Sequence, residues 1–64
     1  MKIRYFKGTD SLYIEFRSGP VAETHDVGED MLFDYDAEGN ICSITVAHAQ
    51  KRVDDLPNFA FELK

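Results

Sequence analysis

Two histidines and a carboxylate between them are the residues of this sequence best suited to acid–base chemistry. His25 and His48 are its only histidines, and Asp34 lies between them in the chain. A carboxylate and an imidazole that reach one substrate can exchange protons with it, so Asp34 with either histidine would suit a small hydrolase or isomerase. The two histidines match no common spacing of metal ligands. We therefore predict no metal and no catalytic residue, with the enzyme kept as an alternative.

The segment Asp34–Gly39 places carboxylates at alternate positions and a glycine at the sixth, as a calcium-binding loop does. The match fails at the twelfth position, Thr45, which cannot supply the carboxylate that closes a calcium shell. The sequence also lacks a glycine-rich phosphate loop. Cys42 is expected to face the core, where burial raises the pKa of a thiol and makes it a poor nucleophile. We therefore predict no cofactor.

The stretch Met31–Val46, which contains these carboxylates, is predicted to form a β-hairpin. Apolar and β-branched residues flank the turn formers Asp36–Gly39, and an aspartate at the first position with glycine at the fourth suits a type I turn with a glycine bulge. A register with Asp36 opposite Asn40 predicts three further pairs: Tyr35 with Ile41, Phe33 with Ser43, and Leu32 with Ile44. Both faces of such a hairpin are partly apolar. One of them would then meet a helix, the end of the chain or a second subunit.

Further strands and a short helix are predicted around the hairpin. Lys2–Phe6 and Ser11–Arg17 alternate apolar and polar residues, as half-buried strands do. Val21–Val27 is more polar, which is typical of an edge strand. Residues 47–53 are better helix formers and predict one or two helical turns. The chain is thus predicted to be a single domain, residues 1–64, of the α+β class but mostly β: one antiparallel sheet of five to six strands, a meander of hairpins, with a short helical segment.

The last residues, 54–64, allow two interpretations. Phe59, Phe61 and Leu63 alternate with polar or small residues and predict a sixth strand. The alternative is a helix with Asp55 as its cap and Pro57 in its first turn. As a strand, this segment could join its own sheet or that of a neighbouring subunit. The candidate residues for self-association are Phe33, Tyr35, Ile41, Phe59 and Phe61.

Size and charge favour a small acidic interaction domain. At 64 residues, with 44% apolar residues, the chain is near the lower limit for a domain that folds unaided, and self-association is a common supplement. Its net charge is −5, and Ser18 to Gln50 contains no Lys or Arg. Such a surface repels nucleic acid and attracts a basic protein. The single cysteine and the lack of a signal peptide or membrane span favour the cytosol.

Several short motifs in this order resemble the YuzE-like family of small prokaryotic domains of unknown function. They are Ser11-Leu12-Tyr13-Ile14, Val21-Ala22-Glu23-Thr24, Asp34-Tyr35-Asp36 with Gly39 and Ile41, and His48-Ala49 followed by Lys51-Arg52. The likeness spans residues 1–53, and Gln50 stands where members often have serine. It implies a compact, sheet-rich, prokaryotic cytosolic domain without an established reaction. Genes for such domains can lie beside those for small toxin-like proteins, which implies an antitoxin-like role as an alternative.

These observations predict a non-enzymatic protein-interaction module that forms a homo-oligomer, with a dimer as the first expectation, and offers an acidic surface to a basic protein. A functional surface of this kind would include Asp34, Asp36, His25, His48 and Tyr13. Among them Asp34 is the least readily explained, because its neighbours on that face of the predicted hairpin are apolar. A carboxylate there must lie at the rim or find a donor such as Tyr13, a lysine or a backbone amide.

Overall fold

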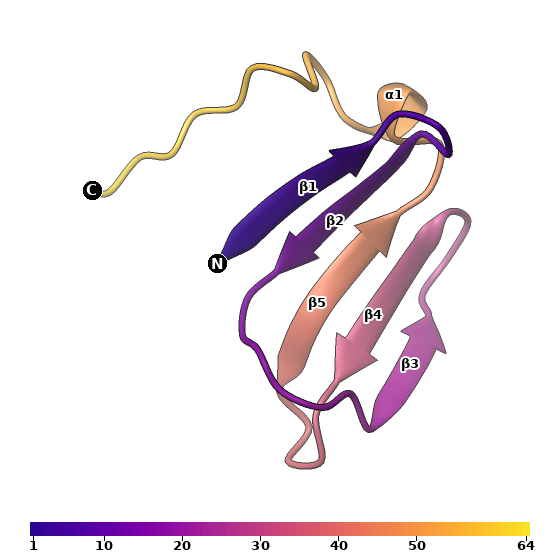
Figure 1. Ribbon diagram of the computed structural model, residues 1–64, viewed down its shortest axis with the longest axis vertical. Coiled ribbons are helices and arrows are strands. Elements are labelled where there is room, and N and C mark those ends of the chain that lie inside the picture. Colours follow the sequence, from indigo (N-terminus) through magenta and orange to yellow (C-terminus); the bar gives the residue numbers. More distant parts are fainter.

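The computed structural model describes residues 1–64 as one five-stranded sheet with a short helix at one end (Figure 1). This confirms the predicted single antiparallel sheet with a short helical segment, and the polar strand lies at an edge as expected. The elements are β1 (Lys2–Phe6), β2 (Ser11–Glu15), β3 (Glu23–Asp26), β4 (Met31–Tyr35), β5 (Ile41–Val46) and α1 (Ala49–Arg52).

The strand order is β1-β2-β5-β4-β3, so the sheet is not the simple meander that the sequence predicted. A meander would place β3 beside β2, but β5 occupies that edge of β2, pairing Leu12 with Val46 and Ile14 with Ile44. The connection from β2 therefore crosses the ends of β5 and β4 to reach the far edge, as Figure 1 shows. Beyond β2, the backbone N–H of Phe16 still donates to Cys42 O at 2.7 Å.

The β4–β5 hairpin forms, but its predicted register is wrong above the turn. Tyr35 lies opposite Ile41 as expected, whereas Phe33 lies opposite Ile44, and Leu32 opposite Thr45. The register shifts by one between Asp34 and Tyr35, because β5 contains one extra residue there, a β-bulge. A constant register cannot anticipate a bulge, and beyond it every predicted cross-strand pair is displaced by one position.

The corrected register gives the sheet one apolar face and one polar face. Cross-strand partners lie on the same face, so the apolar face carries Ile3, Tyr5, Leu12, Ile14, Met31, Phe33, Ile44 and Val46. The face of Leu32 also carries Asp34, Ser43 and Thr45. The interpretation of a hairpin that is apolar on both sides was therefore wrong.

The core lies at one end of the apolar face, under α1. Leu12, Val46 and Ala49 are its buried apolar residues, and Val53 and Leu56 pack against them from the segment after the helix. Ala49 suits this position because its small side chain lets the helix backbone approach the sheet closely. The helix is too short to be stable by itself, so its packing on β2 and β5 holds it in place.

The predicted sixth strand at residues 59–63 is not formed, and neither is the alternative helix. The chain turns at Asp55, whose φ is 49°, and Asn58 N–H donates to Asp55 O at 2.9 Å. We call residues 57–64 the tail segment. Figure 1 shows it extending beyond the β1 side of the sheet, with the end of the chain clear of every strand. A strand needs a paired neighbour, and the tail segment has none in this chain.

Candidate interaction surface

A row of side chains crosses the middle of the apolar face on all five strands. Ile3, Ile14, Ile44, Phe33 and His25 are consecutive cross-strand partners from β1 to β3. We call them the central row. Its four apolar members are not buried, and Ile3 is 42% exposed. Covering this row would remove large apolar side chains from water, the main driving force of association.

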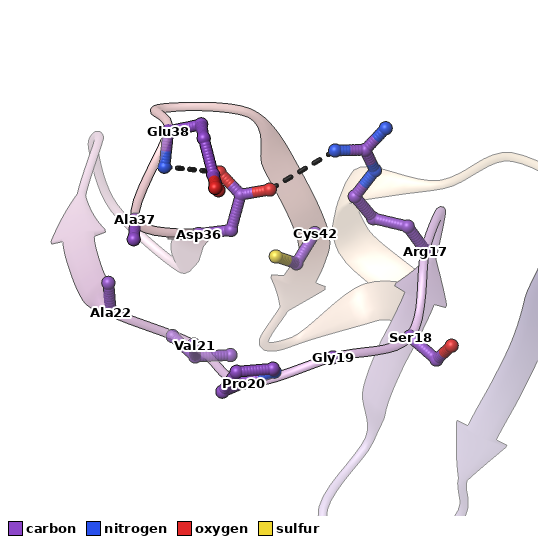
Figure 2. A pocket seen from close by; sticks show the side chains of 10 residues that line it. All are labelled: Arg17, Ser18, Gly19, Pro20, Val21, Ala22, Asp36, Ala37, Glu38 and Cys42. Carbon is purple, nitrogen blue, oxygen red and sulfur yellow. Dashed lines mark hydrogen bonds and ion pairs between the residues drawn. The ribbon is translucent and has the colours of Figure 1, made fainter.

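One end of the apolar face is covered by the chain itself. At one end α1 and Leu56 pack over the row formed by Tyr5, Leu12, Val46 and Met31. At the opposite end of the sheet, the connection 17–22 borders a pocket of about 460 Å³, lined in part by Pro20, Asp36 and Cys42. Figure 2 shows the Cys42 thiol pointing into this pocket, toward the connection. On the apolar face, the central row lies next to the end that α1 covers.

The pocket contains no activated nucleophile. Burial raises the pKa of the Cys42 thiol, and the nearby Asp36 carboxylate raises it further, while Arg17 acts in the opposite direction. A thiol with a raised pKa remains protonated at neutral pH and reacts slowly. Arg17 is already paired, since its Nη1 donates to Asp36 Oδ2 at 3.1 Å, as drawn in Figure 2.

Asp36 is explained by the turn that it stabilises. One carboxylate oxygen accepts the backbone N–H of Asn40 at 2.8 Å and that of Glu38 at 3.0 Å. These bonds, first of all that from Asn40, together with the Arg17 guanidinium, hold the pKa of Asp36 below its ordinary value. Gly39 has a φ of 86°, which a residue with a Cβ adopts at a cost. The predicted roles of Asp36 and Gly39 in the turn are thus confirmed.

Asp34 finds its donors on the two neighbouring strands of the polar face. Ser43 Oγ and Thr24 Oγ1 each donate to one of its carboxylate oxygens at 2.6 Å. Ser43 is only 1% exposed, so its hydroxyl depends on this bond. The expected donors, Tyr13, a lysine or a backbone amide, are not used. Tyr13 lies on the same face and donates to Glu15 at 3.4 Å instead.

His48 lies in a charged cluster at the junction between β5 and α1. Its Nδ1 is 2.8 Å from Asp30 Oδ1, and Arg52 binds the other oxygen of Asp30 and also Glu29. The hydrogen bond with His48, followed by the effects of Arg52, holds the pKa of Asp30 below its ordinary value. Asp30 and His48 both have positive φ, 67° and 50°. These hydrogen bonds and ion pairs connect the β3–β4 turn to the helix and the residue before it.

Gln50 takes part in a second link to the helix. Its backbone N–H donates to the Asp10 carboxylate at 3.2 Å, and its side-chain amide donates to Tyr5 Oη at 3.0 Å. Tyr5 in turn donates to Asp10 at 2.6 Å, and this bond raises the pKa of the phenol. The position at which the resemblance led us to expect serine thus carries an amide that joins α1 to the β1–β2 turn.

The five candidate residues of the predicted functional surface do not meet at one site. Asp34 and Tyr13 lie on the polar face, whereas His25 lies on the apolar face, 5.3 Å from the ring of Tyr35. Asp36 is in the hairpin turn and His48 is at the helix junction. No group of three or more His, Cys, Asp or Glu side chains is arranged to hold a metal ion.

Asp10, Asp30 and Arg52 were missed by the sequence analysis, although they make most of the polar contacts around α1. The only signal was that Asp10 and Asp30 each end a cluster of turn formers just before a strand. Aspartate tolerates positive φ better than most residues, but turn formers do not reveal which distant element the turn contacts.

Charge is divided between the two edges of the sheet. The outer strand β1 and the turn after it carry Lys2, Arg4 and Lys7, which we call the basic edge. The opposite outer strand β3 and the turn after it carry Glu23, Asp26, Glu29 and Asp30, which we call the acidic edge. Every residue of β3 is exposed. A basic partner would therefore be attracted more strongly to the acidic edge than to the basic edge.

Comparison with known protein families matches residues 2–50 to the family described as "Protein of unknown function (DUF2283)". No curated protein and no solved structure matches the chain. The matched region ends within α1, so it includes all five strands and the His48 junction. No helix of the structure has the length and apolar character needed to cross a membrane.

Proposed function

The chain belongs to the DUF2283 family of proteins of unknown function, and we propose that it is a non-enzymatic interaction module that self-associates and offers its acidic edge to a basic protein. The observation that carries this proposal is the partly exposed central row, which lies beside the α1-covered end of the apolar face and which no other segment of the chain is seen to cover. The narrower resemblance to YuzE-like domains, with a prokaryotic cytosolic setting, is part of the same proposal.

The small core supports self-association. Only five of 64 residues are buried, and four of these are apolar. A chain of this length gains little from its own core, whereas a second copy placed over the central row would cover the parts of four large apolar side chains that are still exposed on each partner. At about 25 cal/mol per Å² of apolar surface, such burial is a substantial contribution for a small domain. We therefore propose a homodimer.

Substitution on the two faces of β4 tests the self-association. Phe33→Lys puts a charge into the central row, and Leu32→Lys puts the same charge on the polar face of the same strand. Sedimentation equilibrium at 5 to ~200 µM should show a dimer for the parent chain and for Leu32→Lys, and a monomer for Phe33→Lys. Circular dichroism checks that each variant remains folded. A parent chain that is monomeric throughout this range would refute the proposal.

The acidic edge supports a basic protein as the second partner, and a small basic toxin is the alternative occupant of the same edge. A lysine- and arginine-rich synthetic peptide is a suitable probe, since its binding should weaken steeply as salt rises. Reversal of charge at Glu23 and Asp26 should abolish binding, while reversal at Glu38, in the hairpin turn, serves as the control. Equal binding by both variants would contradict this half of the proposal.

A further inference from the structure

We propose that the tail segment adds as a sixth strand to the free edge of β1 in a second copy of the chain, in an exchange that is reciprocal between the two copies. This inference rests on the proposed self-association and specifies what each copy contributes to the other. It involves the β1 edge of the sheet and the side chains Phe59, Phe61 and Leu63 of the tail segment.

The tail segment has the pattern of a strand but no partner in its own chain. Phe59, Phe61 and Leu63 are 69%, 72% and 91% exposed, and they alternate with Ala60 and Glu62. Alternation of this kind places the three large apolar side chains on one side of an extended backbone. Exposure of three large apolar side chains to water is energetically unfavourable. A group of them on one side of a segment is typical of an interaction site.

The turn before the tail segment directs it away from its own sheet. Asn58 donates to Asp55 through both its backbone N–H, at 2.9 Å, and its side-chain amide, at 3.1 Å. Asp55 is held at positive φ within this turn. With this turn formed, the tail segment does not pair with its own β1, whose outer edge stays open to a strand from another copy. Figure 1 shows the segment already extended past that side of the sheet.

The β1 edge is the better acceptor of the two open edges. β1 has five residues and pairs only with β2, so its outer N–H and C=O groups are free for a further strand. β3 has four residues and carries Glu23 and Asp26, which would repel Glu62. Pairing of β1 with β1 of a second copy would bring the cations of the two basic edges together. A strand that contains Glu62 is instead attracted to this edge.

Cross-strand chemistry selects one antiparallel register. With Phe61 opposite Ile3, Phe59 meets Tyr5 and Leu63 meets Met1, all on the apolar face. In this register Glu62 lies opposite Lys2, which is a favourable cross-strand pair. A shift by two residues in one direction pairs Glu62 with Arg4 but places Lys64 opposite Lys2, a like-charge pair. A shift in the other direction places Ala60 opposite Lys2 and leaves Glu62 beyond the end of β1.

The area involved is sufficient for a specific contact. A buried aromatic side chain removes about 150–250 Å² from water. Two tail segments, each with two phenylalanines and a leucine, therefore carry on the order of 1,000 Å² of side-chain surface, which reaches the lower limit for specific interfaces when the enlarged apolar faces of the two copies cover each other. The tail segments also extend the apolar face beyond Ile3, which enlarges the surface available over the central row.

Disulfide trapping between two differently tagged chains tests the register. Both chains carry Cys42→Ser; one has Ile3→Cys and the other Phe61→Cys. Mixing and mild oxidation should produce a cross-linked heterodimer, because directly opposed Cβ atoms lie about 4.5–5.5 Å apart. Glu62→Cys, on the other side of the same segment, is the matched control and should cross-link at least tenfold less. Cross-linking of Phe61→Cys no better than of Glu62→Cys would overturn the inference.

Removal of residues 58–64 separates this inference from the proposed function. We expect the shortened chain to dissociate at concentrations at least tenfold higher than the full chain, as measured by sedimentation equilibrium. A shortened chain that dimerises as tightly as the full one would overturn the tail exchange and leave self-association through the central row standing. A full-length chain that is monomeric would overturn both. A third chain carries Cys42→Ser, Ile3→Cys and Phe61→Cys together. A cross-linked monomer from this chain, with no cross-linked dimer, would show that the tail segment returns to its own sheet and would overturn the inference.

Discussion

The hydrogen bonds of Asp34 predict that Asp34→Ala lowers the free energy of unfolding more than any other single loss of a carboxylate in this chain. Ser43 and Thr24 each donate to this side chain at 2.6 Å, and Ser43 is almost fully buried. A hydrogen bond to a charged group contributes about 1.5–3 kcal/mol. Because Thr24 is exposed, its bond is expected to lie at the lower end, so the loss should be about 3 kcal/mol.

This loss is large for a domain of 64 residues. At roughly 0.05–0.15 kcal/mol per residue, the whole chain is stable by about 3–10 kcal/mol. With a urea dependence of about 1 kcal/mol per molar, the unfolding midpoint should fall by about 2–3 M. Circular dichroism during a urea titration measures this shift, at a fixed protein concentration because of the proposed dimer.

Asp54→Ala is the matched control, since Asp54 follows α1 and makes no side-chain hydrogen bond. It should move the midpoint by less than about 0.5 M. The double variant with Ser43→Ala should show coupling of about 1–2 kcal/mol between positions 34 and 43. Equal midpoints for the Asp34 and Asp54 variants, or no coupling to Ser43, would refute the assignment of Asp34 to the stability of the polar face.

Three further predictions concern pH, the thiol and the turn. The pKa values of Asp30 and Asp36 are lowered from 3.8 in the folded chain. The stability that these two carboxylates contribute is therefore present above pH 3.8 and is lost as the pH falls through their lower folded pKa values. In acid titrations, the free energy of unfolding of Asp30→Asn should change less than that of the parent chain. Cys42 should react with a disulfide reagent at least tenfold more slowly in the folded chain than in urea, because burial raises its pKa; equal rates would contradict this. Gly39→Ala should cost about 1 kcal/mol through its positive φ alone, since no atom lies where the new Cβ would be, and thermal unfolding should show a midpoint about 4–8 °C lower.

Local patterns in the sequence predicted the five strands that form and the hairpin turn, although the same kind of pattern also predicted a sixth strand at residues 59–63 that does not form. The alternation in Ser11–Arg17 predicted β2, and Asp36 with Gly39 predicted the turn, because these signals depend only on residues adjacent in the chain. The bulge depends instead on how β5 fits between two neighbours, and nothing in its own pattern reports it. The same displacement by one position brought Ser43 opposite Asp34, which is why the donor of this carboxylate was not foreseen.

The strand order and the contacts of the helix were equally beyond the sequence. The position of β3 depends on which strand pairs with the free edge of β2. In this chain β5 pairs there, with Ile44 and Val46 opposite Ile14 and Leu12. The interactions of Asp10 and Asp30 with the helix depend on that arrangement. His48 was identified as a residue of interest, but its partner Asp30 lies on a turn that only the folded sheet brings near.

The position of β5 has a consequence for how the chain is made. This strand is the last to leave the ribosome, yet it lies at the centre of the sheet and joins β2 to the β3–β4 pair. Until it emerges, the nascent protein consists of two separate hairpins, and the backbone N–H and C=O groups of β2 and β4 that later pair with β5 have no partner. The sheet therefore closes only when β5 joins the two hairpins, and their unpaired edges remain open to other chains until that step.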